Sequence, residues 1–190
     1  MKNFLKVFLK VFLICCIILG IFVLRNYMIL NKIHNLQKEL ATKIENSSNF
    51  LYEETSITHL GEIKRYIYYK NNIYKDITYL NNEIEHSNYL NLNEQNNQNQ
   101  SIYLDTVKNN LAKLVDDDLR NFISKNSICQ FIKSTDTQYI IPVNKGTDGY
   151  HDYYYINKNN GMVEKWETKD CVFTYKITDN VVTDSDIEKP

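Results

Sequence analysis

The sequence predicts an α+β fold in which an N-terminal transmembrane helix is followed by a mainly antiparallel sheet. Three observations support this prediction. A start punctuated by lysines leads into an apolar run from Val11 to Leu24. Several short segments rich in Ile, Val and Tyr are separated by Asn-rich turns, which is typical of strands. Residues 105–125 carry apolar side chains at helical spacing, which adds a second helix.

The first element is a membrane anchor. Residues 7–24 are apolar apart from Lys10, whose amine can reach the headgroups, so they provide the roughly 17–25 residues that a membrane-crossing helix needs. A secretory signal peptide begins similarly, but residues 21–24 lack the small side chains that signal peptidase requires. A lipoprotein cleavage site would need a small residue directly before Cys15 or Cys16, and neither has one. An uncleaved anchor is therefore favoured over a removed peptide.

The charge distribution predicts the orientation of the anchor. Three lysines precede the apolar core, and positive charge is retained in the cytoplasm. Residues 1–6 are therefore expected to form a short cytoplasmic tail, and residues 7–30 the anchor and its exit. Residues 31–190 number about 160, enough for one domain with its own core. We expect a single-pass protein of the cell membrane with this domain outside.

The exported part is acidic. Residues 1–30 hold four of the 22 Lys and Arg residues and none of the 23 Asp and Glu residues. This leaves 18 cations against 23 anions, a formal net charge of −5. The cations are not clustered, which argues against nucleic acid as a partner.

The first half of the domain is predicted to be a helix followed by a hairpin. Residues 63–70 and 73–80 are expected to be strands joined by Asn71-Asn72, because asparagine tolerates the positive φ of a tight turn. Residues 86–101 are rich in Asn and Gln and are expected to form a solvated loop. Before the hairpin, an apolar stripe at helical spacing continues the anchor into the domain; its members are Ile33, Leu36, Leu40 and Ile44.

The second half is predicted to be a helix followed by strands. Residues 105–125 form the helix, with Asp105 as its N-cap, and its apolar stripe is expected to pack on Phe173 and Tyr175. The stripe consists of Val107, Leu111, Leu114, Val115, Leu119 and Phe122. The strands are residues 137–143, 150–156, 162–167 and 171–177, and the acidic tail 179–190 is expected to be extended.

The sequence carries no recognisable catalytic signature, and we predict neither an enzyme, nor a metal site, nor a cofactor. It has no nucleophile elbow, no phosphate-binding glycine loop and no paired histidines at metal-ligand spacing. A Cys129–His151 dyad is disfavoured because Cys129 lies among apolar residues, which raise the pKa of a thiol. The carboxylates of residues 116–118 point in different directions on a helix and lack calcium-loop spacing.

Two candidate features remain. Cys129 and Cys171 are both exported, where a disulfide is possible, although the spacing does not decide whether they are adjacent. Aromatic residues occur on both faces of two predicted strands, so one side could line an apolar groove while the other packs in the core. Ordinary sheet packing is the alternative interpretation. The candidate groove residues are Tyr66, Tyr68, Tyr153 and Tyr155.

The order of elements and two motifs resemble the lipoprotein-carrier superfamily, which contains LolA-like and anti-sigma-regulator-like envelope proteins. In this superfamily a strand pair follows the pattern Tyr-Ile-Asp-Lys-x-Thr-Gly-Leu-Pro-x-Lys. Ile156, Lys158, Gly161, Met162 and Lys165 match that pattern in type, whereas Asn157 replaces its Asp and Val163 its Pro. The end of the chain, residues 182–190, is similar to the family's Val-x-Asp-x-Asp-Ile-x-x-Pro.

This resemblance implies an incomplete antiparallel β-barrel whose apolar concave face is covered by helices and binds acyl chains or regulatory partners. A tether argues against a carrier that shuttles between membranes. We therefore weigh two functions. The first is a membrane-anchored extracytoplasmic binding module for a lipid or lipoprotein segment. The second is an envelope regulatory protein that binds another membrane protein through an edge strand or an acidic surface.

Overall fold

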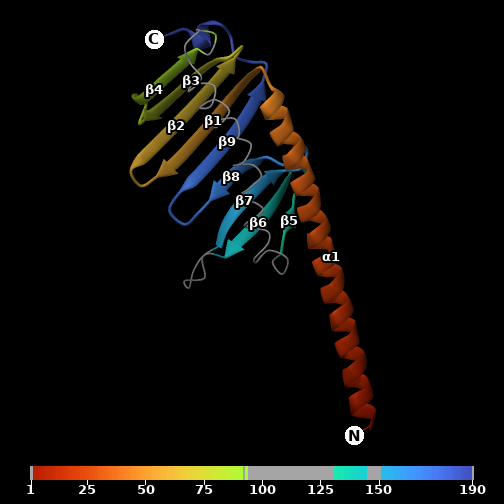
Figure 1. The fold of residues 1–190 in the computed structure, drawn as a ribbon. Coiled ribbons are helices and arrows are strands. Elements are labelled where there is room, and N and C mark those ends of the chain that lie inside the picture. Colours follow the sequence, from red (N-terminus) through yellow and green to blue (C-terminus); the bar gives the residue numbers. More distant parts are fainter. Residues whose placement is uncertain (1, 92, 94–130, 145–150, 190) are drawn as a thin grey trace.

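The structure is a computed structural model that describes residues 2–91, 93, 131–144 and 151–189. In this part of the chain it consists of one long helix and one nine-stranded sheet, with the helix extending beyond the sheet at its N-terminal end (Figure 1). The predicted helix 105–125, its contacts with the sheet and Cys129 lie outside the described residues.

The helix α1 (Lys2–Asn46) is continuous over 45 residues, so the apolar N-terminal segment continues into the domain as helix, as predicted. It is long and apolar enough to cross a membrane: its most apolar 18-residue window has a mean hydropathy of 3.0 and is 0% buried. Side chains that are apolar and unprotected by protein suit a lipid environment. The helix thus has the length and composition that the predicted membrane-spanning helix requires.

The strands form an open antiparallel sheet in the order β4-β3-β2-β1-β9-β8-β7-β6-β5. Two meanders, β1 to β4 and β5 to β9, are joined where β1 pairs with β9. Within the described residues β4 and β5 are the two edges, so the predicted incomplete barrel and its helical cover remain predictions. The strands are β1 (Asn49–Thr58), β2 (Gly61–Lys70), β3 (Ile73–Leu80), β4 (Glu83–Asn91), β5 (Lys133–Ser134), β6 (Gln138–Asn144), β7 (His151–Asn157), β8 (Val163–Glu167) and β9 (Val172–Asp179).

The predicted Asn71-Asn72 hairpin is confirmed. Lys70 pairs with Ile73, and both asparagines adopt positive φ, 48° and 66°. Asn81 and Asn82 repeat this turn between β3 and β4, with φ of 50° and 71°. Because such a turn follows the twist of the strands it joins, each Asn pair produces a tight hairpin.

The expected loop at residues 86–101 is wrong over its first part, because residues 86–91 complete β4. There Leu90 pairs with Tyr74 of β3. The polar residues that suggested a loop lie on an edge strand whose first half is exposed, and polar side chains suit such an edge. The strand β1, which lies between β2 and β9, was not identified individually. The later strands β6 to β9 occur within two residues of their predicted ends.

One face of the sheet packs against α1, and we call it the helix face; the opposite face is the outer face. Two clusters of buried residues form the core between α1 and the helix face. The first contains Leu30, Ile33, Ile132, Tyr139, Ile141, Ile156 and Val163, and the second contains Ile44, Phe50, Tyr52, Ile67, Tyr69 and Tyr74. Of the predicted helical stripe, Ile33 and Ile44 are fully buried, Leu40 packs against the second cluster, and Leu36 is half-buried.

A polar contact joins α1 to the β7–β8 turn. Gln37 is 1% exposed, and its Nε2 donates a hydrogen bond to the carbonyl of Gly161 at 3.0 Å. Gly161 has a φ of +73°, and a Cβ added there would lie 2.8 Å from the Cβ of Leu36. Only glycine allows the turn to come this close to the helix. Beside this contact lies a small cleft lined by Leu36, Glu39, Leu40, Lys43, Asn159, Asn160, Ile177 and Asp179.

The acidic tail is not simply extended, as the sequence suggested. Val182 and Ile187 are buried, and residues Ser185–Ile187 form a short 3-10 helix, η1, that contacts β2 and β3. Asp186 accepts hydrogen bonds from the backbone and hydroxyl of Thr183, which hold the pKa of its carboxyl below the usual value. The two apolar side chains explain why the tail packs against the sheet, since their burial is favourable.

Candidate binding face

The four tyrosines predicted to line a groove all lie on the outer face, but in two separate groups. Along their strands they alternate with helix-face residues such as Tyr69, which pairs with Phe50 of β1. The four tyrosines therefore point away from α1. Tyr66 and Tyr68 lie on β2, and Tyr153 and Tyr155 lie on β7; the strands β1, β9 and β8 separate the pairs. The structure therefore does not bring the four side chains into one groove.

The first group, on β2, is an aromatic cluster. The rings of Tyr66 and Tyr68 stack with centroids 6.2 Å apart, and Tyr79 of β3 meets Tyr66 edge-on at 5.9 Å. Burial raises the pKa of the Tyr68 hydroxyl. This shift favours the neutral form of the Tyr68 hydroxyl.

Charged residues surround the second group and occupy the strands between the two groups. Tyr155 donates a hydrogen bond to Glu167 at 2.9 Å, and the Lys165 amine lies 4.7 Å from the centre of its ring. The Lys165 ammonium and the Tyr155 hydroxyl together lower the pKa of Glu167. Between the groups, Lys176 and Glu53 form an ion pair at 3.0 Å. This arrangement does not form a continuous apolar groove across the outer face.

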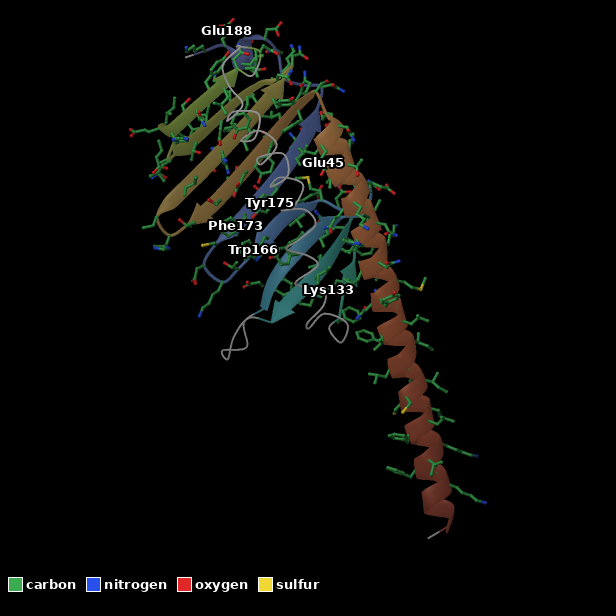
Figure 2. All side chains as sticks on the ribbon, viewed as in Figure 1. Glu45, Lys133, Trp166, Phe173, Tyr175 and Glu188 are labelled. Atoms are coloured by element: carbon green, nitrogen blue, oxygen red, sulfur yellow. The ribbon has the colours of Figure 1, made fainter. Side chains whose placement is uncertain are left out.

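The helix face instead carries a continuous row of large aromatic residues, which we call the aromatic row: Tyr154, Trp166 and Phe173. They come from the neighbouring strands β7, β8 and β9, where Trp166 pairs with both of the others. The rings of Tyr154 and Trp166 stack at 5.7 Å and an interplanar angle of 12°, and those of Trp166 and Phe173 at 4.8 Å and 19°. Figure 2 labels Trp166 and Phe173, with Tyr175 next to them on β9.

The aromatic row is only partly included in the core. Tyr154 and Tyr175 pack against the first buried cluster, whereas Trp166 and Phe173 belong to neither cluster and are half-buried. The helix α1 contributes Leu30 and Ile33 to the first cluster and Ile44 to the second, and neither cluster includes the rings of Trp166 and Phe173. Half-buried stacked rings offer flat apolar surfaces to a ligand.

Beyond Phe173 and Tyr175, the helix face becomes polar. Ser56 lies opposite Phe173 and Glu54 opposite Tyr175 on β1. Tyr52 donates a hydrogen bond to Glu54 at 3.2 Å, and burial, followed by the charge of Glu54, raises the pKa of the Tyr52 hydroxyl. The aromatic row thus ends at a hydrogen-bonded polar edge rather than at open solvent.

Next to this edge, Arg65 and Asp76 form a bidentate ion pair. The guanidinium donates to the two carboxylate oxygens at 3.1 and 2.7 Å. Tyr74 donates to the same carboxylate at 3.0 Å. The hydrogen bonds to Asp76 raise the pKa of Arg65, so the guanidinium stays charged. This geometry is typical of a structural ion pair, because both oxygens of the buried Asp76 carboxylate accept hydrogen bonds.

The candidate disulfide has one member in the described part of the chain. Cys171 precedes β9 and is half-buried, and Cys129 lies outside the described residues, so the structure does not test their pairing. Within the described ranges, no group of three or more His, Cys, Asp or Glu residues is placed to hold a metal ion.

Sequence reasoning missed Trp166 and assigned the neighbours of Tyr154 to the groove. The signal that could have identified the row is the single tryptophan of the chain, placed in a predicted strand. Adjacency of Tyr154 and Trp166 depends on a register shift between Tyr155 and Ile156, for which the sequence gives no sign. The sequence matches no protein-family model, and it has no significant match among curated proteins.

Proposed function

We propose that this protein is a single-pass membrane protein whose extracytoplasmic domain binds an apolar ligand, a lipid or a lipoprotein segment, at the aromatic row. The observation that carries the proposal is the stack of Tyr154, Trp166 and Phe173 on the helix face. Apolar surface that is not fully taken up by the core of a domain is typical of a binding site. The resemblance to LolA-like proteins, which bind acyl chains on a sheet face, agrees with this choice.

The anchor determines what kind of binding module this is. Because α1 runs without interruption from the apolar segment into the core, the sheet is fixed to the anchor rather than joined by a flexible linker. The ligand would therefore be held next to the membrane to which the protein is attached. This is the role of a stationary acceptor or sensor, not of a shuttling carrier.

The single tryptophan permits a direct test with the full chain in nanodiscs. We expect a brominated fatty acid to quench Trp166 fluorescence saturably, and the unbrominated fatty acid to reverse the quenching. Phe173→Ala should weaken binding by about tenfold, since loss of a stacked aromatic contact removes roughly 1 kcal/mol or more. Tyr66→Ala, on the outer face, is the matched control and should bind as wild type does.

Two results would contradict this function. One is the absence of saturable quenching with fatty acids, phospholipids and lipopeptides alike. The other is equal weakening by Phe173→Ala and Tyr66→Ala, which would mean that binding does not involve the helix face.

A second function is favoured by the edge strand β4. Its first half is exposed, Ile84 is 64% exposed, and Glu83 and Glu85 flank it. An exposed strand edge can pair with a strand of another protein, which would make the domain a regulatory partner of a membrane protein. A photo-crosslinking residue at Ile84 should then capture one discrete membrane protein in cells, and one at Lys176 on the outer face should not. Equal patterns from both positions would exclude this alternative.

A further inference from the structure

We propose that the β5 end of the domain is seated in the headgroup region of the phospholipid bilayer, with the ring of Phe131 inserted and Arg25 and Lys133 at the level of the phosphates. This inference rests on the anchor of the proposed function and is independent of its ligand. It assigns to the exposed end of the sheet a second contact with the membrane, in addition to the helix that spans it.

The height of Phe131 relative to the anchor follows from one distance. Its ring centroid lies 6.2 Å from that of Phe22, which belongs to the apolar run that ends at Leu24. A helix rises about 1.5 Å per residue, so Phe22 lies roughly 3 Å below the end of this run along the helix axis. Whatever the tilt of α1, Phe131 cannot lie more than 6.2 Å above the level of Phe22. When residues 7–24 span the bilayer, Phe131 is therefore at its outer boundary.

The exposure of Phe131 shows that protein does not cover it. The side chain is 61% exposed, whereas the adjacent Ile132 is fully buried in the first core cluster with Leu30 and Ile33. Alternation along the chain thus directs Ile132 into the core and Phe131 outward, next to the anchor. An exposed phenyl ring at the level of a bilayer boundary is stabilised by entering the apolar side of the interface.

Two cations accompany the ring. Arg25, the residue that ends the apolar run, donates a hydrogen bond from its guanidinium to the carbonyl of Ile132 at 3.2 Å. The same guanidinium lies 5.7 Å from the centre of the Phe131 ring. Lys133, labelled in Figure 2 beside α1, is exposed on β5. At the bilayer interface an aromatic ring suits the upper part of the acyl chains, and neighbouring Arg and Lys side chains suit the phosphates.

This arrangement also accounts for Arg25 on the side of the anchor from which positive charge is usually excluded. Its guanidinium is bound to the domain and to a ring, so the residue joins the anchor to the sheet at the membrane surface. The sheet contacts α1 both at Arg25 and at the β7–β8 turn. These two contacts fix the orientation of the sheet relative to the helix and therefore to the bilayer.

The test uses the full chain in liposomes and Trp166→Phe as the background, which leaves no other tryptophan. Phe131→Trp is compared with two further positions. Tyr27→Trp, on an exposed helical residue just past the apolar run, reports the interface. Val181→Trp reports water, because Val181 is 43% exposed and adjoins Asn180, which is bonded to Asn49 just past the distal end of α1. That end lies roughly 30 Å along the helix from Arg25.

We expect phospholipids brominated near the headgroup to quench Phe131→Trp as strongly as Tyr27→Trp, and aqueous iodide to quench both less than Val181→Trp. Quenching of Phe131→Trp by iodide but not by bromolipid would overturn the inference, because the ring would then be in water. Quenching by neither would also overturn it, because protein would then cover the ring. If Tyr27→Trp itself escapes bromolipid, the anchor of the proposed function fails as well, which distinguishes the two failures.

Discussion

Replacing Gly161 with alanine is expected to destabilise the domain by about 2–5 kcal/mol. The glycine has a φ of +73°, and this left-handed conformation costs an alanine roughly 1–2 kcal/mol. The added Cβ would lie 2.8 Å from the Cβ of Leu36 and 3.0 Å from the backbone nitrogen of Gln37. Because these neighbours belong to a rigid helix, the overlap adds about 1–3 kcal/mol. The turn must move away from α1 to relieve it.

The structural consequence is loss of the contact between α1 and the β7–β8 turn. Gln37 is 1% exposed, and moving the turn would deprive its buried amide of the Gly161 carbonyl. Urea unfolding of the detergent-solubilised full chain, followed by Trp166 fluorescence, measures the change in free energy of unfolding. Gly20→Ala is the matched control, since a Cβ at Gly20 meets no atom within 4 Å. Equal stability of the two variants would mean that the turn does not dock on α1.

The parts of the fold that the sequence predicts well are those set by neighbours in the chain. The long apolar helix follows from an unbroken apolar run, and the Asn71-Asn72 turn follows from two residues that tolerate positive φ. The stripe on α1 was predicted to within one polar residue. Gln37 lies on the buried side because the Gly161 carbonyl, distant in sequence, accepts its hydrogen bond, and helical periodicity cannot reveal such a partner.

The candidate site was harder to predict because it depends on which strands are neighbours. Alternation along a strand correctly places Tyr66 and Tyr68 on one face, but it does not tell how many strands separate them from Tyr153. The pairing of β1 with β9 joins the first strand to the last, and this long-range contact leaves no local pattern. The aromatic row likewise arises from strand order and from a register shift beside Ile156.

Replacing Asp76 with alanine is expected to destabilise the domain by about 2–4 kcal/mol, through a cluster that the sequence did not indicate. The Asp76 side chain is 5% exposed and receives hydrogen bonds from Arg65 and from the fully buried Tyr74. Removing one partner of a buried ion pair typically costs about 3–5 kcal/mol, because the remaining charge loses its counterion. Here the Arg65 side chain is 40% exposed, so water can solvate the guanidinium and the loss is smaller.

Two comparisons separate this explanation from a general effect of losing a charge. Lys176→Ala removes an ion pair with Glu53 whose lysine side chain is 68% exposed, and it should change stability by less than about 1 kcal/mol. The double variant Arg65→Met/Asp76→Leu replaces the whole pair by apolar side chains and should be more stable than Asp76→Ala alone. Urea unfolding measures all three. If the double variant is as unstable as the single one, the loss comes from the buried Tyr74 hydroxyl without its acceptor rather than from an uncompensated Arg65, and the ion pair then contributes little to holding β2 against β3.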